Sequence, residues 1–109
     1  MSERQRLPNR RASETFGFHC GNFHYVATIS RFPDDRLAEI FIGNGKAGSG
    51  MDTAAKDSAV VASIALQYGV PLDVIRKALL RDVRGNASSP LGVALGLIGG
   101  EGAPSQERG

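Results

Sequence analysis

Two short runs of alternating side chains, separated by a glycine and an asparagine, constrain the fold of this chain most strongly. The first run places two aromatic rings on one side of a strand, and its other residues on the opposite side: Phe16 and Phe18 against Gly17 and His19. The second run has apolar residues at every other position: Phe23, Tyr25, Ala27 and Ile29. Gly21-Asn22 suits a two-residue hairpin turn, because glycine tolerates the positive φ that such a turn requires. We predict a β-hairpin that pairs Cys20 with Phe23, His19 with His24 and Phe18 with Tyr25.

A third strand and at least two helices follow the hairpin. Pro33-Asp34-Asp35 is typical of a turn, and an apolar strand runs from about residue 37 to 42. Asp52 or Thr53 can cap a helix to about Tyr68, and Pro71 suits the first turn of a second helix. A short third helix can begin after Ser88 or Ser89, although its two glycines weaken it. The pattern predicts an α+β fold, a three-stranded antiparallel meander with two, or three, helices packed on one face.

Length and composition limit what the chain can contain. At 109 residues it fits one small domain, which we expect over 14–98, between a basic flexible arm (1–13) and a disordered tail (99–109). Its single cysteine excludes an intramolecular disulfide, and no apolar run reaches the roughly 20 residues of a membrane span. We therefore expect a cytoplasmic protein without a membrane partner. The formal net charge of +2 is too small to indicate nucleic acid by itself.

A glycine-rich segment joins the third strand to the first helix. Gly43, Gly45 and Gly48 match the dinucleotide pattern G-x-G-x-x-G, but that fold needs a parallel β-α-β unit, which the hairpin excludes. A Walker A loop is also excluded, since Lys46 is followed by alanine. The segment can still hold a phosphate or nucleotide through backbone N–H groups, with Lys46, Ser49 and the arginines Arg10 and Arg11. A purely structural turn is the interpretation we favour over this anion site.

Four other residues are candidates for a functional site. His19 and His24 lie opposite each other, but no third metal ligand is expected on their face, so a pair without metal is favoured. For Cys20 we favour a buried structural thiol over a nucleophile. For Glu39 we favour an outward-facing strand residue over a partly buried acid. We therefore predict no catalytic and no metal-binding residue.

Several segments together resemble one family. The segments are Leu7-Pro-Asn-Arg-Arg11, the strand from Asp35 to Ile42, Lys46-Ala-Gly48, and Leu66 to Leu72. In this order they are similar to the TSCPD domain, which lies near the C-terminus of adenosylcobalamin-dependent (class II) ribonucleotide reductases. The resemblance runs from about Leu7 to Leu80. It departs from the motif that names the family, because Ser89 stands where the cysteine is expected and Leu91 where the aspartate is expected.

The resemblance implies an accessory role and not reductase chemistry. That chemistry requires a large barrel and several cysteines, which this chain cannot supply, and we expect no adenosylcobalamin or other cofactor in it. Our first hypothesis is a stand-alone module that binds a protein partner, with a ribonucleotide reductase as the candidate. The alternative is a small regulator that binds phosphate or a nucleotide. Nucleic acid stays open as a partner through the N-terminal arginines, and a second copy stays open through a sheet edge or the uncovered sheet face.

Overall fold

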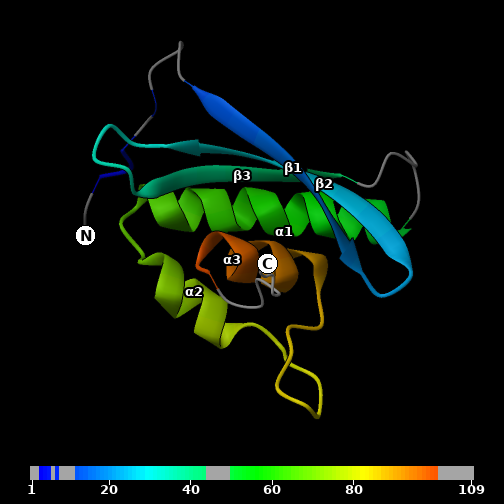
Figure 1. Ribbon diagram of the computed structural model, residues 1–109. Helices are drawn as coiled ribbons and strands as arrows, with labels where there is room; N and C mark the ends of the chain where they lie inside the picture. Colours follow the sequence, from blue (N-terminus) through cyan, green and yellow to red (C-terminus); the bar gives the residue numbers. More distant parts are fainter. Residues whose placement is uncertain (1–2, 6, 8–11, 44–49, 101–109) are drawn as a thin grey trace.

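The computed structural model describes residues 3–5, 7, 12–43 and 50–100, and it arranges them in two layers (Figure 1). The sheet layer contains β1 (Ser13–Cys20), β2 (Phe23–Arg31) and β3 (Leu37–Gly43), all antiparallel, in the order β1-β2-β3. The helical layer contains α1 (Gly50–Gln67), α2 (Leu72–Ala78) and α3 (Pro90–Ile98). The predicted α+β meander is confirmed, and the third helix, left open by the sequence, is present.

The β1–β2 hairpin has the predicted register. Cys20 pairs with Phe23, His19 with His24 and Phe18 with Tyr25. Gly21 in the turn has a φ of 61°, in the left-handed region that glycine adopts without a steric penalty. The two-residue turn thereby fixes which side chains of both strands face the helices.

The hydrophobic core lies between the sheet and two of the helices. In Figure 1, α1 runs beneath β3 and α3 lies on the same side of the sheet, in contact with β1. The face of α1 toward the sheet consists mostly of small residues, which let the helix axis approach the strands: Ala55, Ala59 and Ala62. The sheet contributes larger side chains: Phe18, Tyr25, Ile29, Ile40 and Ile42. The helix α2 packs on α3, so α1 and α3 are the main cover of the sheet.

Polar side chains of α1 hold the outer edge of β3. The Oγ atom of Ser63 accepts a hydrogen bond from the backbone N–H of Ile40 at 2.8 Å and donates one to the Ile40 carbonyl at 3.0 Å. Gln67 donates from Nε2 to the carbonyl of Ala38 at 3.1 Å. An unpaired strand edge is a template for pairing with another chain. The helix therefore closes this edge of the sheet.

Some element boundaries differ from the sequence prediction. The helix α1 begins at Gly50, so Asp52 lies within its first turn and not at the cap. Pro71 is the N-cap of α2 and precedes its first turn. Inside the segment predicted as a flexible arm, Arg4 donates from Nε to Gln67 Oε1 at 2.6 Å, and the Gln5 N–H donates to the Gln67 carbonyl. The division into arm, domain and tail stays a prediction.

Candidate functional site

The glycine-rich segment is the candidate anion site that the sequence offered as the alternative to a purely structural turn. Only part of it belongs to the described residues. Gly43 is described and ends β3. The other predicted members lie outside the described residues: Gly45, Lys46, Gly48, Ser49, Arg10 and Arg11. A Cβ atom on Gly43 would lie 3.6 Å from Lys56 Cε and 3.8 Å from Asp52 Oδ1. The start of the segment thus sits beside a charged pair of α1.

That charged pair occupies the N-terminal end of α1. Asp52 is 2% exposed, and its Oδ2 lies 2.9 Å from Nζ of Lys56, one turn further along the helix. A carboxylate in the first turn stabilises the positive end of the helix dipole, and here it is itself neutralised by lysine. An external anion at this helix end would have to approach a buried carboxylate. The sequence pointed to Asp52 only as a cap, and its burial depends on contacts that a linear pattern does not contain.

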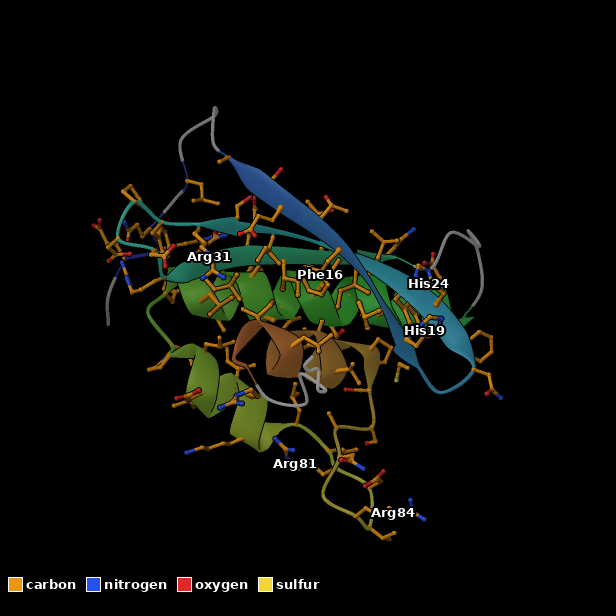
Figure 2. The ribbon with its side chains drawn as sticks, in the orientation of Figure 1. Phe16, His19, His24, Arg31, Arg81 and Arg84 are labelled. Carbon is orange, nitrogen blue, oxygen red and sulfur yellow. The ribbon has the colours of Figure 1, made fainter. Side chains whose placement is uncertain are left out.

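The two predicted histidines lie together on the open face of the sheet, the face that carries no helix (Figure 2). Their rings are 4.9 Å apart, edge to face, and both side chains are exposed. Gly17 makes room for one of them, since a Cβ at this position would come within 2.7 Å of His24 Nε2. Among the described residues no group of three metal-ligating side chains exists. The pair is therefore solvent-facing, whereas the sequence favoured a pair without metal and left both a solvent-facing and a helix-covered position open.

The exposure of side chains on the open face changes from one end of the strands to the other. Near the histidines it carries two exposed apolar side chains, Phe41 at 48% and Val26 at 41% exposure. Next to them, the hydroxyl of Thr15 on β1 lies 3.2 Å from that of Thr28 on β2. At the other end Ser30 and Glu39 are only 4% and 7% exposed. Glu39 therefore lies on the same face as Phe41 but is buried there, so our preference for an outward-facing residue over a partly buried acid is corrected in respect of its burial. The exposed part of the face, formed by Val26, Thr28, Phe41 and the two histidines, is called the open patch below.

Cys20 lies at the hairpin end of β1 and is half-buried. Burial raises the pKa of its thiol above the usual value, which keeps the sulfur protonated near neutral pH. A nucleophilic cysteine needs the opposite shift, because the thiolate is the reactive form. The environment agrees with a structural thiol, as favoured from the sequence.

A rigid loop between α2 and α3 projects from the body of the molecule (Figures 1 and 2). Asp82 Oδ1 accepts hydrogen bonds from the N–H groups of Arg84 and Asn86, both at 2.9 Å. Arg81 donates from Nη1 to the Gly85 carbonyl at 2.8 Å. Val83, at the tip, is fully exposed. The loop is thus fixed by its own hydrogen bonds while its tip contacts solvent.

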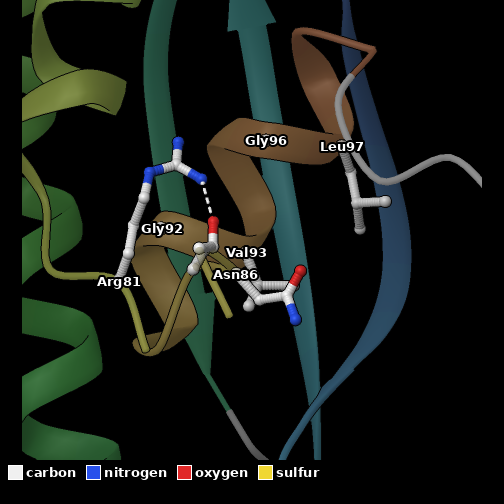
Figure 3. Close-up of a pocket in the computed structure, with 8 residues that line it drawn as sticks. Arg81, Asn86, Gly92, Val93, Gly96 and Leu97 are labelled. Atoms are coloured by element: carbon white, nitrogen blue, oxygen red, sulfur yellow. Dashed lines mark hydrogen bonds between the residues drawn. The ribbon is translucent and has the colours of Figure 1, made fainter. Parts of the chain in front are cut away.

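A cavity of about 380 Å³ separates this loop from α3 (Figure 3). Its rim carries Arg81 and Asn86, and its floor is the helix surface around Gly92 and Gly96, flanked by apolar side chains. A guanidinium and an amide above an apolar floor suit a small amphipathic group. The sequence indicated a turn at 84–86 and two glycines in the third helix. It did not indicate that the turn lies against these glycines, because no local pattern encodes a contact between the two segments.

Ser89 has a structural role at the start of α3. Its Oγ accepts a hydrogen bond from the N–H of Gly92 at 3.1 Å, and Pro90 follows in the first turn. Serine is among the residues that best satisfy the unpaired N–H groups of a helix start. The residue that stands where the family motif has cysteine therefore caps a helix in this chain.

The comparisons with known proteins identify the family. The family model of the TSCPD domain matches residues 2–102. The chain belongs to the TSCPD domain family. The matched range extends past Leu80 and includes the projecting loop and α3, so the TSCPD domain covers more of the chain than its individual motifs indicated. No solved structure matches the chain.

Curated relatives of this TSCPD domain are large enzymes. It is 37% identical over 73 residues to a vitamin B12-dependent ribonucleotide reductase of Bradyrhizobium diazoefficiens, which covers 67% of this chain and 6% of that protein. For proteins of the same description the values are 39% over 72 residues in Rhodopirellula baltica (66% and 7%) and 37% over 70 residues in Streptantibioticus cattleyicolor (64% and 12%). The chain therefore spans between 6% and 12% of the length of these relatives. No helix in the described part of the chain is long and apolar enough to cross a bilayer.

Proposed function

We propose that this chain is a stand-alone TSCPD module that acts by binding a ribonucleotide reductase, without catalysis or a cofactor of its own. The comparisons support this proposal, because the matching segment of the relatives is a small part of a reductase chain. A domain that is covalently attached to an enzyme in one protein can serve the same enzyme as a separate chain in another. This role places the module in the cytoplasm, where deoxynucleotides are made.

The open patch carries the proposal. A three-stranded sheet that has helices on one face leaves its other face to solvent or to a partner. Phe41 and Val26 project there at about half exposure, on strands that the core holds rigid. Apolar and aromatic side chains at the centre of a rigid patch, with polar residues around them, are typical of protein interfaces. We assign this surface to the reductase.

The proposal is tested with purified proteins. The chain is titrated with the ribonucleotide reductase of its own source organism, and the Kd is compared between the wild-type chain and two variants. Phe41→Glu should weaken binding by tenfold or more, because it replaces the exposed phenyl ring of the patch with a charge. Val61→Glu is the matched control, since Val61 is 66% exposed on α1, away from the open face. Equal losses in both variants, or no binding of the wild type, would contradict the proposal.

The second candidate is a regulator that binds phosphate or a nucleotide through the glycine-rich segment. It is supported by the position of that segment, directly before the N-terminus of α1, where backbone N–H groups attract anions. The buried Asp52 weighs against it. Titration with inorganic phosphate and ATP, followed by amide shifts, should move Gly43 and Asp52, and Lys46→Ala should weaken binding several-fold. Unchanged shifts at these residues would reject this candidate.

A further inference from the structure

The outer edge of β1 presents a predictable set of backbone groups. In an antiparallel ladder, neighbouring residues point their N–H and C=O groups to opposite sides. Ile40 directs both groups away from β2, toward Ser63, so its partner Ile29 directs its own toward Glu14 of β1. It follows that Ser13, Thr15, Gly17 and His19 direct their backbone groups outward. Among the described residues, no backbone hydrogen bond reaches these four from beyond the hairpin.

In the part of the chain that the structure describes, this edge lacks the features that usually prevent strand pairing. Edge strands are commonly protected by lysine, proline, a bulge or a covering element. β1 is eight residues long and contains neither lysine nor proline, and its pairing with β2 is regular throughout. Its one acidic residue, Glu14, lies near one end, 3.6 Å from Arg31 Nε. The opposite edge of the sheet, on β3, is closed by Ser63 and Gln67, so the two edges differ sharply.

The helix next to this edge is apolar on every side. The α3 sequence Pro-Leu-Gly-Val-Ala-Leu-Gly-Leu-Ile contains no polar side chain, and Val93, Leu97 and Ile98 are only partly buried. A helix without a polar face is normally buried all round. A groove of about 270 Å³ runs between α3 and the start of β1, and it is lined by the apolar side chains of Phe16, Ile29, Leu97 and Ile98 together with Glu14 and Arg31. Apolar side chains of the helix therefore lie beside the free edge, next to the Glu14–Arg31 ion pair.

We propose that two copies of this chain pair through β1, antiparallel and centred on Gly17, to form a continuous six-stranded sheet. The occupant is a second copy because the edge is complementary to itself in this register. Gly17 faces Gly17 of the second copy, Thr15 faces His19, and Phe16 faces Phe18, so no like charges meet. The facing aromatic rings add to the backbone hydrogen bonds. The same axis brings the apolar helix α3 of each copy toward its counterpart.

Hydrogen exchange tests the pairing through an alternating pattern. Amide exchange of the full chain is followed by NMR at low and at high protein concentration. The Thr15, Gly17 and His19 amides should slow about tenfold or more as the dimer forms, whereas Phe16 and Phe18, already bonded to β2, should change little. Dimerisation without this alternation would overturn the proposal.

The native cysteine provides an independent test of the pairing, through the distance between the two Cys20 residues of the dimer. In the proposed register Cys20 faces Glu14 of the second copy, which separates the two Cys20 residues by six positions along the strands. At about 3.4 Å per residue their Cα atoms lie about 20 Å apart. Spin labels on this single cysteine should give a pulsed-EPR distance distribution consistent with that separation. A well-defined distance far from it, or a monomer at all concentrations, would also overturn the pairing.

Two variants of Thr15 test the contribution of its outward backbone N–H group to the pairing. Thr15→Pro removes an outward N–H without removing a β1–β2 hydrogen bond, and should raise the dimer Kd by tenfold or more in sedimentation equilibrium. Thr15→Val keeps this N–H and loses only the hydroxyl contact with Thr28, so its dimer Kd should stay within about twofold. Equal effects of the two variants would contradict edge pairing. If Thr15→Pro fails to fold, the exchange pattern and the label distance of the wild-type sequence still decide.

Discussion

Single polar residues in the core of this domain have defined tasks. Ser63 is 5% exposed and satisfies both backbone groups of Ile40 with one hydroxyl. Tyr25 is 1% exposed beneath the centre of the sheet. Asp52 is neutralised by Lys56 at the start of α1. Ser63 and Asp52 are each buried together with a partner, because a buried polar atom without one costs more than its hydrogen bond contributes.

Ser63→Ala should lower the free energy of unfolding by about 1–3 kcal/mol, because it leaves the N–H and C=O of a buried strand residue unpaired. Ser58→Ala is the control on the same helix. Its hydroxyl bonds only to the carbonyl of Ala55, within α1, and its loss should change stability by about 0.5 kcal/mol or less. Urea unfolding followed by circular dichroism measures both values. Equal destabilisation by the two variants would show that Ser63 does not hold the β3 edge.

Tyr25 should make the domain sensitive to alkaline pH. Burial, and then the charges of Cys20 and Asp52, raise the pKa of its phenol above the ordinary value of 10.0. The folded state therefore holds this proton more tightly than the unfolded state, so its contribution is fully present below pH 10 and is lost as the pH rises further. Urea midpoints between pH 8 and 11 should fall less steeply for Tyr25→Phe than for the wild type. Parallel curves would contradict this assignment.

At the scale of elements, features that depend on neighbouring residues could be predicted from the sequence. Features that depend on contacts between distant segments could not. The hairpin register could be predicted because a two-residue turn and the alternation of side chains fix it within a few residues. The start of α1 could not, since Gly50, Asp52 and Thr53 compete as starting points and tertiary contacts decide among them. The burial of Glu39 and the cavity beside Arg81 arise from contacts between distant segments, which no local pattern encodes.

The capping of α3 gives a prediction at this scale. Ser89→Ala should destabilise the domain by about 1 kcal/mol, because the Gly92 N–H loses its side-chain acceptor. Ser88→Ala is the neighbouring control, since that hydroxyl donates to Leu80 at an exposed position and its loss should have a smaller effect. Thermal unfolding compares the two variants. If Ser88→Ala were the more damaging, the cap would not be what holds the start of α3.

For the whole molecule, the sheet offers two surfaces that share one residue, since His19 contributes its side chain to the open patch and its backbone to the β1 edge. The open patch faces away from the helices, whereas the β1 edge lies in the plane of the sheet, so the two contacts can be made together. A dimer through β1 would place two open patches on one continuous sheet face. Each copy would then bind its own reductase chain. Because the dimer holds the two patches close together, the two binding events would strengthen the overall affinity.

The two surfaces should therefore be separable by mutation. Phe41→Glu should weaken reductase binding by tenfold or more and leave the dimer Kd within about twofold, whereas Thr15→Pro should give a monomer that still binds the reductase through an intact patch. Sedimentation equilibrium and reductase titration on the same preparations measure both properties. Loss of both properties in either single variant, while circular dichroism shows a folded chain, would mean that the surfaces are not independent.

The most direct measurement is an NMR titration of the labelled chain with the unlabelled ribonucleotide reductase of its source organism. Our account predicts that the amide signals of Val26, Thr28 and Phe41 broaden or shift first, and that those of Val61 and Val74, exposed on the helical side, follow only as the whole complex grows heavier. Saturable binding with that pattern would support the TSCPD module as a reductase partner. A spectrum that stays unchanged at reductase concentrations well above those of the chain would contradict it.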